Sequence, residues 1–350
     1  MTDELASITN DGAILMGRLL CVDGHAYGRK FFAFTHMHTD HSTKLAKCLY
    51  NGQVYMTKPT RDLLEAINDD NYGSNTNHIK KTQIITMDYN DSRLIADGER
   101  GISEKITFRE SSHVLGSAQV EIISKDKKIL YSGDISPGDE PPKDVHTLVV
   151  DSTHGHPQYA RHGDPDSLER RFIDLMKEVI CGDARPVVIH AHRGKLQEIM
   201  SLIAPIKELN NDDISIMTSA TNIRIAMAYK KYNFDMPSKI LDEKSDDAEG
   251  IMEKNHLPFI QFTTSFYKQE HEINGKAYSI FLADYPTDQF KENEDRSVFE
   301  TTSHADYDAL INYVEKSNAE KVIVDNYRTR QAKKLVEELK KKQIDAIAQP

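Results

Sequence analysis

Three histidines and an aspartate crowd into residues 36–41, "HMHTDH", directly after the apolar run "FFAF". A fold gains nothing from packing these groups together, because each buried ring or carboxylate needs a polar partner. His36 and His38 stand at positions i and i+2, so on an extended backbone both rings face one side. Asp40 and His41 follow as the chain turns. The spacing predicts two pairs of ligands aimed at two adjacent metal ions.

The donor types predict which metals would bind. Imidazole and carboxylate without thiolate suit two zinc ions, with manganese as an alternative at a harder second site. The three cysteines Cys21, Cys48 and Cys181 are far apart in the chain, which favours neither a cysteine zinc site nor a disulfide framework.

Two more candidate ligands follow further along the chain. His113 in "SSHVLGSAQVE" comes just before an apolar stretch, beside a turn of small residues. Asp134 ends the apolar run in "KILYSGD", where a carboxylate could bridge two metals. Each residue alone would equally suit a loop histidine or a turn former. Their order after the histidine cluster makes them a coherent set.

Short strands are expected to carry these residues in the first half of the chain. The segment 30–35 reads as a buried strand that ends at the cluster, and 118–124 with 128–134 reads as a hairpin around "KDKK". The apolar segment "HTLVV" predicts another strand that leads into the polar loop "DSTHG".

Helices and strands alternate after residue 162. A helix is expected from Asp164 as N-cap and Pro165 as first residue to a stop at Gly182, followed by strands and helices in turn up to the last helix, "RQAKKLVEELKKKQ". This alternation predicts a parallel sheet covered on both faces. The basic run of the last helix is interpreted as a solvated face.

Composition limits the partners of the protein. The 350 residues carry a formal charge of −11, so a globally basic nucleic-acid surface is absent, and any such substrate must be attracted locally. No stretch approaches the ~20 apolar residues that span a bilayer. A cytoplasmic protein without a membrane partner is expected.

Taken together, the motifs resemble those of the metallo-β-lactamase fold and of its β-CASP family. HxHxDH, "SHVLGSA" and "SGD" look like successive metal motifs, "VDSTHG" is similar to the acidic motif before the β-CASP insertion, and "TTSHADYDAL" resembles the later histidine motif. Relatives of that kind include the polyadenylation-factor endonuclease, RNase J and Artemis. The resemblance implies an α/β protein: an αββα sandwich formed by 1–163 and 295–350, with a compact β-CASP-like α/β domain inserted at 164–294.

The resemblance also implies roles for individual residues. His36, His38 and His113 would hold one metal, Asp40 and His41 the other, and Asp134 would bridge them. His304 would be the general acid and Asp151 the carboxylate that orients it. A hydroxide activated by the two metals would attack phosphorus, and a histidine beside a carboxylate could protonate the leaving oxygen near pH 7.

The sequence departs from the family pattern at one motif. RNA-processing members have a histidine after the apolar strand that corresponds to "KVIVDNY", whereas this chain has Asp325. A carboxylate there could complete the second metal site and make it harder. The alternative is a structural residue hydrogen-bonded to the next loop.

Several functions remain open at this point. The leading hypothesis is a nuclease for single-stranded RNA, and a DNA nuclease is the rival within the family. A small-molecule metallo-hydrolase, such as a thioester or cyclic-nucleotide enzyme, and a catalytically silent binding partner are rivals from other classes. A homodimer is an open alternative for the assembly, as are endo- and exonuclease action.

Overall fold

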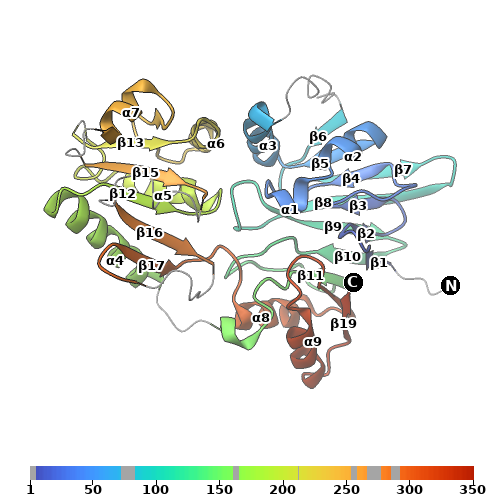
Figure 1. The fold of residues 1–350 in the computed structure, drawn as a ribbon. Coiled ribbons are helices and arrows are strands. Elements are labelled where there is room, and N and C mark those ends of the chain that lie inside the picture. The colour runs from blue at the N-terminus through green and yellow to red at the C-terminus, as the bar shows by residue number, and fades with distance from the viewer. Residues whose placement is uncertain are drawn as a thin grey trace. The chain divides into compact units, whose positions relative to one another are not determined.

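The computed structural model describes residues 5–71, 83–160, 165–211, 213–253, 258–265, 277–284 and 292–350. The chain forms two compact units (Figure 1). Unit 1 comprises Met1–Leu64, Tyr72–Arg161 and Ser303–Pro350, and unit 2 comprises Glu65–Asn71 and His162–Thr302. Among the described residues, no helix is both long and apolar enough to cross a membrane.

Unit 1 contains two sheets. The first, of mixed direction, runs in the order β1 (Ala6–Ile8), β2 (Ile14–Met16), β3 (Leu20–Val22), β4 (Phe31–Ala33), β5 (Gln53–Met56) and β6 (Ile84–Thr86). The second runs in the order β19 (Ala346–Gln349), β18 (Lys321–Asp325), β11 (Thr147–Val150), β10 (Lys127–Tyr131), β9 (Ala118–Ser124), β8 (Ile102–Glu110) and β7 (Ser92–Asp97). Strands β10, β11, β18 and β19 pair in parallel, while β7 to β10 form an antiparallel meander.

Helices flank both sheets of unit 1. Figure 1 shows α1 (Thr39–Ser42), α2 (Leu45–Asn51) and α3 (Lys58–Asn71) beside the first sheet, with α8 (Tyr307–Ser317) and α9 (Ala332–Lys341) beside the second. A short 3-10 turn, η3 (Pro157–Tyr159), precedes residue 160. The predicted strand at 30–35 and the predicted hairpin at 118–134 are confirmed by β4 and by the pairing of β9 with β10.

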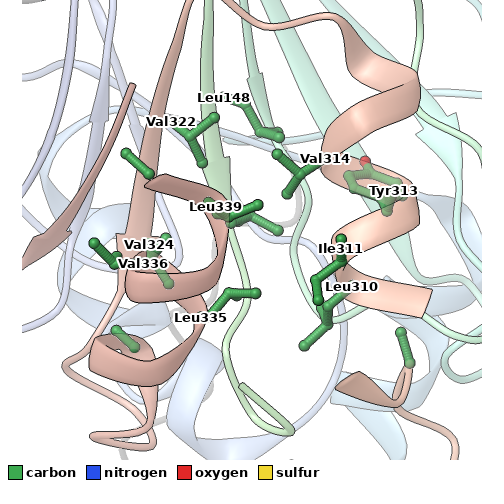
Figure 2. Close-up of a cluster of buried hydrophobic side chains, with 14 of the residues drawn as sticks. Leu148, Leu310, Ile311, Tyr313, Val314, Val322, Val324, Leu335, Val336 and Leu339 are labelled. Carbon is green, nitrogen blue, oxygen red and sulfur yellow. The ribbon is translucent and has the colours of Figure 1, made fainter. Parts of the chain in front are cut away.

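An apolar core lies where α8 and α9 cover the second sheet (Figure 2). Leu335 and Leu339 of α9 pack with Leu310 and Val314 of α8 and with Leu148 of β11. The apolar residues of α9 recur every three or four positions, so one stripe is buried and the lysines face solvent. The solvated basic face predicted for this helix is confirmed.

Unit 2 is built on one parallel sheet. Its order is β14 (Leu241–Asp242), β13 (Ser215–Thr218), β15 (Phe259–Thr263), β12 (Val187–His190), β16 (Tyr278–Ala283) and β17 (Arg296–Glu300), and every pair is parallel. Helices α4 (Pro165–Lys177), α5 (Lys195–Ile203), α6 (Ala220–Lys231) and α7 (Asp246–Glu253) alternate with the strands. The predicted parallel sheet is confirmed.

The ends of two predicted elements differ in detail from the expectation. After α4 the chain continues through a π-helical turn, Glu178–Gly182, and stops at Gly182 as expected. The predicted N-cap Asp164 lies outside the described residues. Strand β17 follows the expected boundary at residue 295 but pairs with β16, so it extends the sheet of unit 2.

Candidate metal centre

Strand ends bring the candidate residues of unit 1 together. Because β10, β11 and β18 run parallel, their carboxyl ends meet at one edge of the second sheet. Asp134 follows β10, Asp151 follows β11 and Asp325 ends β18. The histidine cluster leaves the first sheet just after β4, and Ala118 N donates to Thr35 O (3.0 Å), which ties this loop to β9.

A tight turn delivers Asp134 to the histidines. Gly133 has φ 57°, and a Cβ atom at this position would lie 3.0 Å from the Thr35 methyl carbon. Glycine adopts this left-handed conformation without the strain that a side chain adds, and a Cβ atom here would crowd the neighbouring loop. The Gly133 turn therefore lets Asp134 approach residues 35–41 closely.

Three imidazole nitrogens and one carboxylate oxygen converge in the first cluster. His38 Nδ1 lies 3.1 Å from His36 Nε2 and 3.1 Å from His113 Nε2. Asp134 Oδ2 lies 3.4 Å from His36 Nε2 and 3.5 Å from His113 Nε2. Ligands 2.0–2.1 Å from a tetrahedral zinc stand about 3.3 Å apart, so this donor set fits a zinc ion.

The second cluster uses the other oxygen of Asp134. His41 Nε2 lies 3.2 Å from Asp134 Oδ1 and 3.4 Å from Asp40 Oδ2. This nitrogen is buried and makes no hydrogen bond within the described part of the chain. Its distances to the two carboxylates are therefore those expected between ligands of one metal ion. The Asp40 side chain is 60% exposed, which leaves the second cluster open to solvent. Asp134 thus presents one oxygen to each cluster.

Asp23 orients His41, and sequence reasoning missed it. Its Oδ2 lies 2.7 Å from His41 Nδ1 and accepts a hydrogen bond from Thr35 Oγ1, while its Oδ1 accepts one from Thr35 N. A carboxylate on the far nitrogen fixes the ring and the tautomer of a metal-binding histidine. The available signal was the aspartate that ends the apolar run "LLCVD".

The electrostatics of the clusters favour a bound cation. Burial raises the pKa of Asp134, but His41 and His36 outweigh burial and hold that pKa well below its usual range. Burial lowers the pKa of His41, but Asp134, Asp40 and Asp23 outweigh it and raise that pKa well above its ordinary value. Burial, together with the neighbouring His304, lowers the pKa of His113. In the absence of a metal ion, a proton on His41 therefore balances the negative charge of the neighbouring carboxylates, which a bound metal ion could balance instead.

His304 stands beside the first cluster. Its Nδ1 lies 3.7 Å from Asp151 Oδ2 and 4.0 Å from Asp134 Oδ2, and its ring centre lies 4.4 Å from that of His113. The segment around it is fixed within unit 1, because Ala305 N donates to Ile135 O (2.6 Å). The placement suits a proton donor as well as a ligand.

Asp151 is fixed on one side only. Its Oδ1 accepts hydrogen bonds from Thr153 N and Thr153 Oγ1, both 2.8 Å, whereas its buried Oδ2 makes none within the described residues. The oxygen that faces His304 is thus available to a protonated imidazole.

Asp325 lies apart from both clusters. Its Oδ1 accepts from Tyr327 N (2.8 Å) and its Oδ2 from Arg328 Nη1 (2.5 Å). Arg328 Nη2 also donates to Gly12 O (3.2 Å) and to Asp23 O (3.3 Å). Both side chains of this ion pair are buried, and among the described residues Asp325 joins neither group of converging donor atoms. Sequence reasoning did not identify Arg328.

Comparison with known proteins gives relatives of one kind. The chain is 29% identical over 209 residues to an "RNase J-like protein" of Methanocaldococcus jannaschii, covering 57% of this chain and 49% of that protein. It is 24% identical over 285 residues to "Endoribonuclease YSH1" of Kluyveromyces lactis, covering 71% of this chain and 35% of that protein. The chain therefore spans half or less of the length of these curated relatives. No protein-family model matches it.

A solved structure shares the fold over most of the chain. It is a protein of unknown function from Enterococcus faecalis V583, with a TM-score of 0.61 and 14% sequence identity, covering 92% of this chain and 80% of that one. The curated relatives are β-CASP nucleases of the metallo-β-lactamase family. The ordered motifs and these alignments lead to one conclusion: the chain is similar, over half of its length or more, to β-CASP nucleases of the metallo-β-lactamase family.

Proposed function

We propose that this protein is a metal-dependent ribonuclease. The donor atoms of unit 1 converge in two clusters that share Asp134, and the curated relatives carry ribonuclease names. In this proposal the two sheets of unit 1 and their helices form an αββα sandwich, and the parallel sheet of unit 2 forms the inserted β-CASP-like domain.

Six residues would hold two cations. His36, His38 and His113 would bind the first, Asp40 and His41 the second, and Asp134 would bind one with each oxygen. The donor set favours zinc, and the solvent-open second site, with two carboxylates to one imidazole, also suits manganese. Asp325 would act through Arg328 rather than as a direct ligand, because its two oxygens already accept hydrogen bonds.

The reaction would be hydrolysis of a phosphodiester. Bound divalent cations lower the pKa of water and neutralise charge on the phosphate. The chain itself would supply a proton donor in His304, and Asp151 Oδ2 would stabilise the protonated ring from 3.7 Å. A ribose oxygen is a poor leaving group, so a positioned proton donor has a clear use here.

The single observation that carries the proposal is the division of Asp134 between the clusters. One oxygen lies 3.4 Å from His36 Nε2, and the other lies 3.2 Å from His41 Nε2. A carboxylate that only closes a salt bridge needs one partner, whereas a carboxylate bridging two cations must face both. Cations held by the two clusters would neutralise charge on a bound phosphate.

Metal analysis with two substrates tests the proposal. The purified protein should contain two divalent ions per chain and cleave single-stranded RNA faster than DNA of the same sequence. Asp40→Ala or His41→Ala should remove one ion, while Asp91→Ala, which alters an exposed carboxylate of the same unit, should remove none. Unchanged metal content in both cluster variants would overturn the ligand assignment. Preferential cleavage of DNA would make the protein a DNA nuclease instead of a ribonuclease.

A further inference from the structure

Two tyrosines of unit 1 are unusually exposed. Tyr27 is 90% exposed and Tyr50 is 89% exposed, more than any other large hydrophobic side chain among the described residues. Tyr27 lies in the loop between β3 and β4, and Tyr50 lies on α2. Single exposed aromatics are ordinary, so these two rings matter only through what surrounds them.

Lysines accompany the two tyrosines. Lys47 Nζ lies 4.7 Å from the centre of the Tyr27 ring. Helix α2 buries Leu45, Cys48 and Leu49, and its other face presents Lys47 and Tyr50 three residues apart. The exposed N-cap residue Lys44 lies one turn before Lys47. We call the four residues Tyr27, Lys44, Lys47 and Tyr50 the tyrosine–lysine surface.

Packing supports the Tyr27 part of the surface. His25 meets the Tyr27 ring edge-on with ring centres 5.4 Å apart, and it stacks on the buried Phe32 of β4 with centres 5.5 Å apart. The Cys48 thiol donates to Gly24 O (3.1 Å), which fastens α2 to the same loop. A ring supported in this way loses little conformational freedom when a ligand stacks on it.

Local charge is opposite to that of the whole chain. Residues 24–51 carry the cations Arg29, Lys30, Lys44 and Lys47 and the single carboxylate of Asp40, whereas the chain as a whole has a net charge of −11. Of these cations, Lys30 pairs with Glu99 outside the segment (3.7 Å). Neither Lys44 nor Lys47 forms an ion pair with a carboxylate in the part of the chain that the structure describes. The surface therefore offers positive charge that the protein does not neutralise itself.

The same two segments also carry the metal centre. Asp23, which orients His41, directly precedes the loop that holds Tyr27. Helix α1, with Asp40 and His41, ends at Ser42, two residues before Lys44. The surface and the metal centre are therefore carried by neighbouring segments of the chain.

We propose that the tyrosine–lysine surface binds single-stranded RNA, with unpaired bases stacked on Tyr27 and Tyr50 and phosphates near Lys44 and Lys47. Exposed aromatic faces bind bases of any sequence, and lysines follow the backbone. A duplex buries its base faces and cannot use the rings. The inference rests on the proposed ribonuclease function, and it assigns residues outside the metal centre that would hold unpaired bases of the substrate.

Binding measurements separate the two parts of the surface. Anisotropy of a labelled, hydrolysis-resistant phosphorothioate RNA would be followed with the metal-loaded protein over a range of salt concentrations. Tyr27→Ala and Tyr50→Ala should each weaken binding by about 5- to 100-fold without changing the salt dependence. Lys44→Gln and Lys47→Gln should each reduce the slope of log affinity against log salt by about 0.7.

Matched variants on β7 and β8 serve as controls. Leu94→Ala removes another exposed apolar side chain, and Lys105→Gln removes another exposed charge. Both should bind RNA as the wild type does, and duplex RNA should bind the two tyrosine variants as it binds the wild type, because only the stacking contacts require unpaired bases. Wild-type affinity and salt slope in all four surface variants would overturn the proposal, as would equal losses in the controls.

Cleavage assays keep this proposal apart from the ribonuclease proposal. A protein that binds RNA through the surface but hydrolyses none with either metal overturns the ribonuclease function and leaves the binding surface standing. If all the surface variants bind and cleave RNA as the wild type does, the ribonuclease proposal is retained and the proposed RNA-binding surface is wrong.

Discussion

His304 has one ring nitrogen near two carboxylates, which defines a test of its role. Its Nδ1 is 3.7 Å from Asp151 Oδ2. If the ring protonates the leaving oxygen, His304→Ala should slow RNA cleavage by roughly 10²–10⁴-fold, the usual contribution of a positioned acid. Hydrolysis of bis(4-nitrophenyl) phosphate should fall much less, because nitrophenolate leaves without a proton. Both rates would be measured at saturating metal.

Two further measurements show whether His304 acts as an acid or as a ligand. Metal content should be unchanged in His304→Ala, and Asp151→Asn should show the same asymmetry between substrates more mildly, because it removes the orienting charge but keeps the donor. Equal losses on both substrates together with a lower metal content would make His304 a ligand.

The Asp325–Arg328 pair predicts effects of opposite sign at the second metal position. Arg328 donates to Asp23 O, and Asp23 orients His41, so the guanidinium is a fixed positive charge near that position. Asp325→Asn leaves this charge uncompensated and should weaken binding of the second cation. Arg328→Met removes the charge, frees the Asp325 carboxylate and should strengthen it. Calorimetric titration with Mn²⁺ measures both.

Arg328→Lys keeps the charge and serves as the matched control, with second-site affinity near that of the wild type. If Asp325 is instead a ligand that Arg328 positions, Arg328→Met would weaken the second site. That outcome would restore the ligand role which the sequence suggests for Asp325.

At the scale of elements, one buried carboxylate joins the two sheets of unit 1. Glu104 of β8 accepts hydrogen bonds from Arg18 N (2.8 Å) and Leu19 N (3.0 Å), which lie between β2 and β3, and from Ser124 Oγ (2.5 Å) of β9. Glu104→Gln replaces one accepting oxygen by an NH₂ group, which would face the N–H and O–H donors that the carboxylate now binds. The change should lower the free energy of unfolding by about 1–3 kcal/mol, because buried polar groups lose their partners.

Chemical denaturation followed by circular dichroism measures this loss. Glu99→Gln, which alters a side chain that is 87% exposed, is the control and should change the unfolding free energy by less than about 0.5 kcal/mol. Equal effects of the two substitutions would show that Glu104 does not contribute to joining the sheets.

At the scale of the whole molecule, the cysteines report unfolding. Cys21 and Cys48 are buried in unit 1, and Cys181 is exposed in unit 2. Burial raises the pKa of Cys21 to about 12 and that of Cys48 well above its usual range, so both thiols stay protonated and unreactive. A chromogenic disulfide reagent should modify one thiol per native chain quickly and the other two only as unit 1 opens.

Cation binding should slow the reaction of the two buried thiols. Ligands that bind only the folded state reduce the open population, and β3, which carries Cys21, leads directly to Asp23 beside the second cluster. Adding Zn²⁺ should therefore lengthen the time needed to label the buried pair, with Asp134→Asn as the variant that loses this effect. Fast labelling of all three thiols in native protein would contradict the prediction.

The sequence alone determined the types and the order of the groups that meet in unit 1. Residues 36–41, Asp134 and Asp151 stand at the ends of apolar segments, His113 stands just before one, and His304 was identified from the resemblance of its motif. Parallel strand ends bring Asp134 and Asp151 to one edge of the sheet. The parallel sheet of unit 2 was predictable for a similar reason, since the alternation of strand and helix is a local pattern.

Only the tertiary structure decided which groups pair with which. Asp23 meets His41 across 18 residues, and Arg328 reaches Asp23 O across 305 residues. The membership of β17 in the sheet of unit 2, like the exposure of Tyr27 and Tyr50, is also settled only by packing. Periodicity tells which face of an element is apolar, but it does not tell which distant segment covers that face or leaves it open. Asp325 shows this limit most clearly, because the buried guanidinium three residues further on occupies the carboxylate that the sequence offered to a metal.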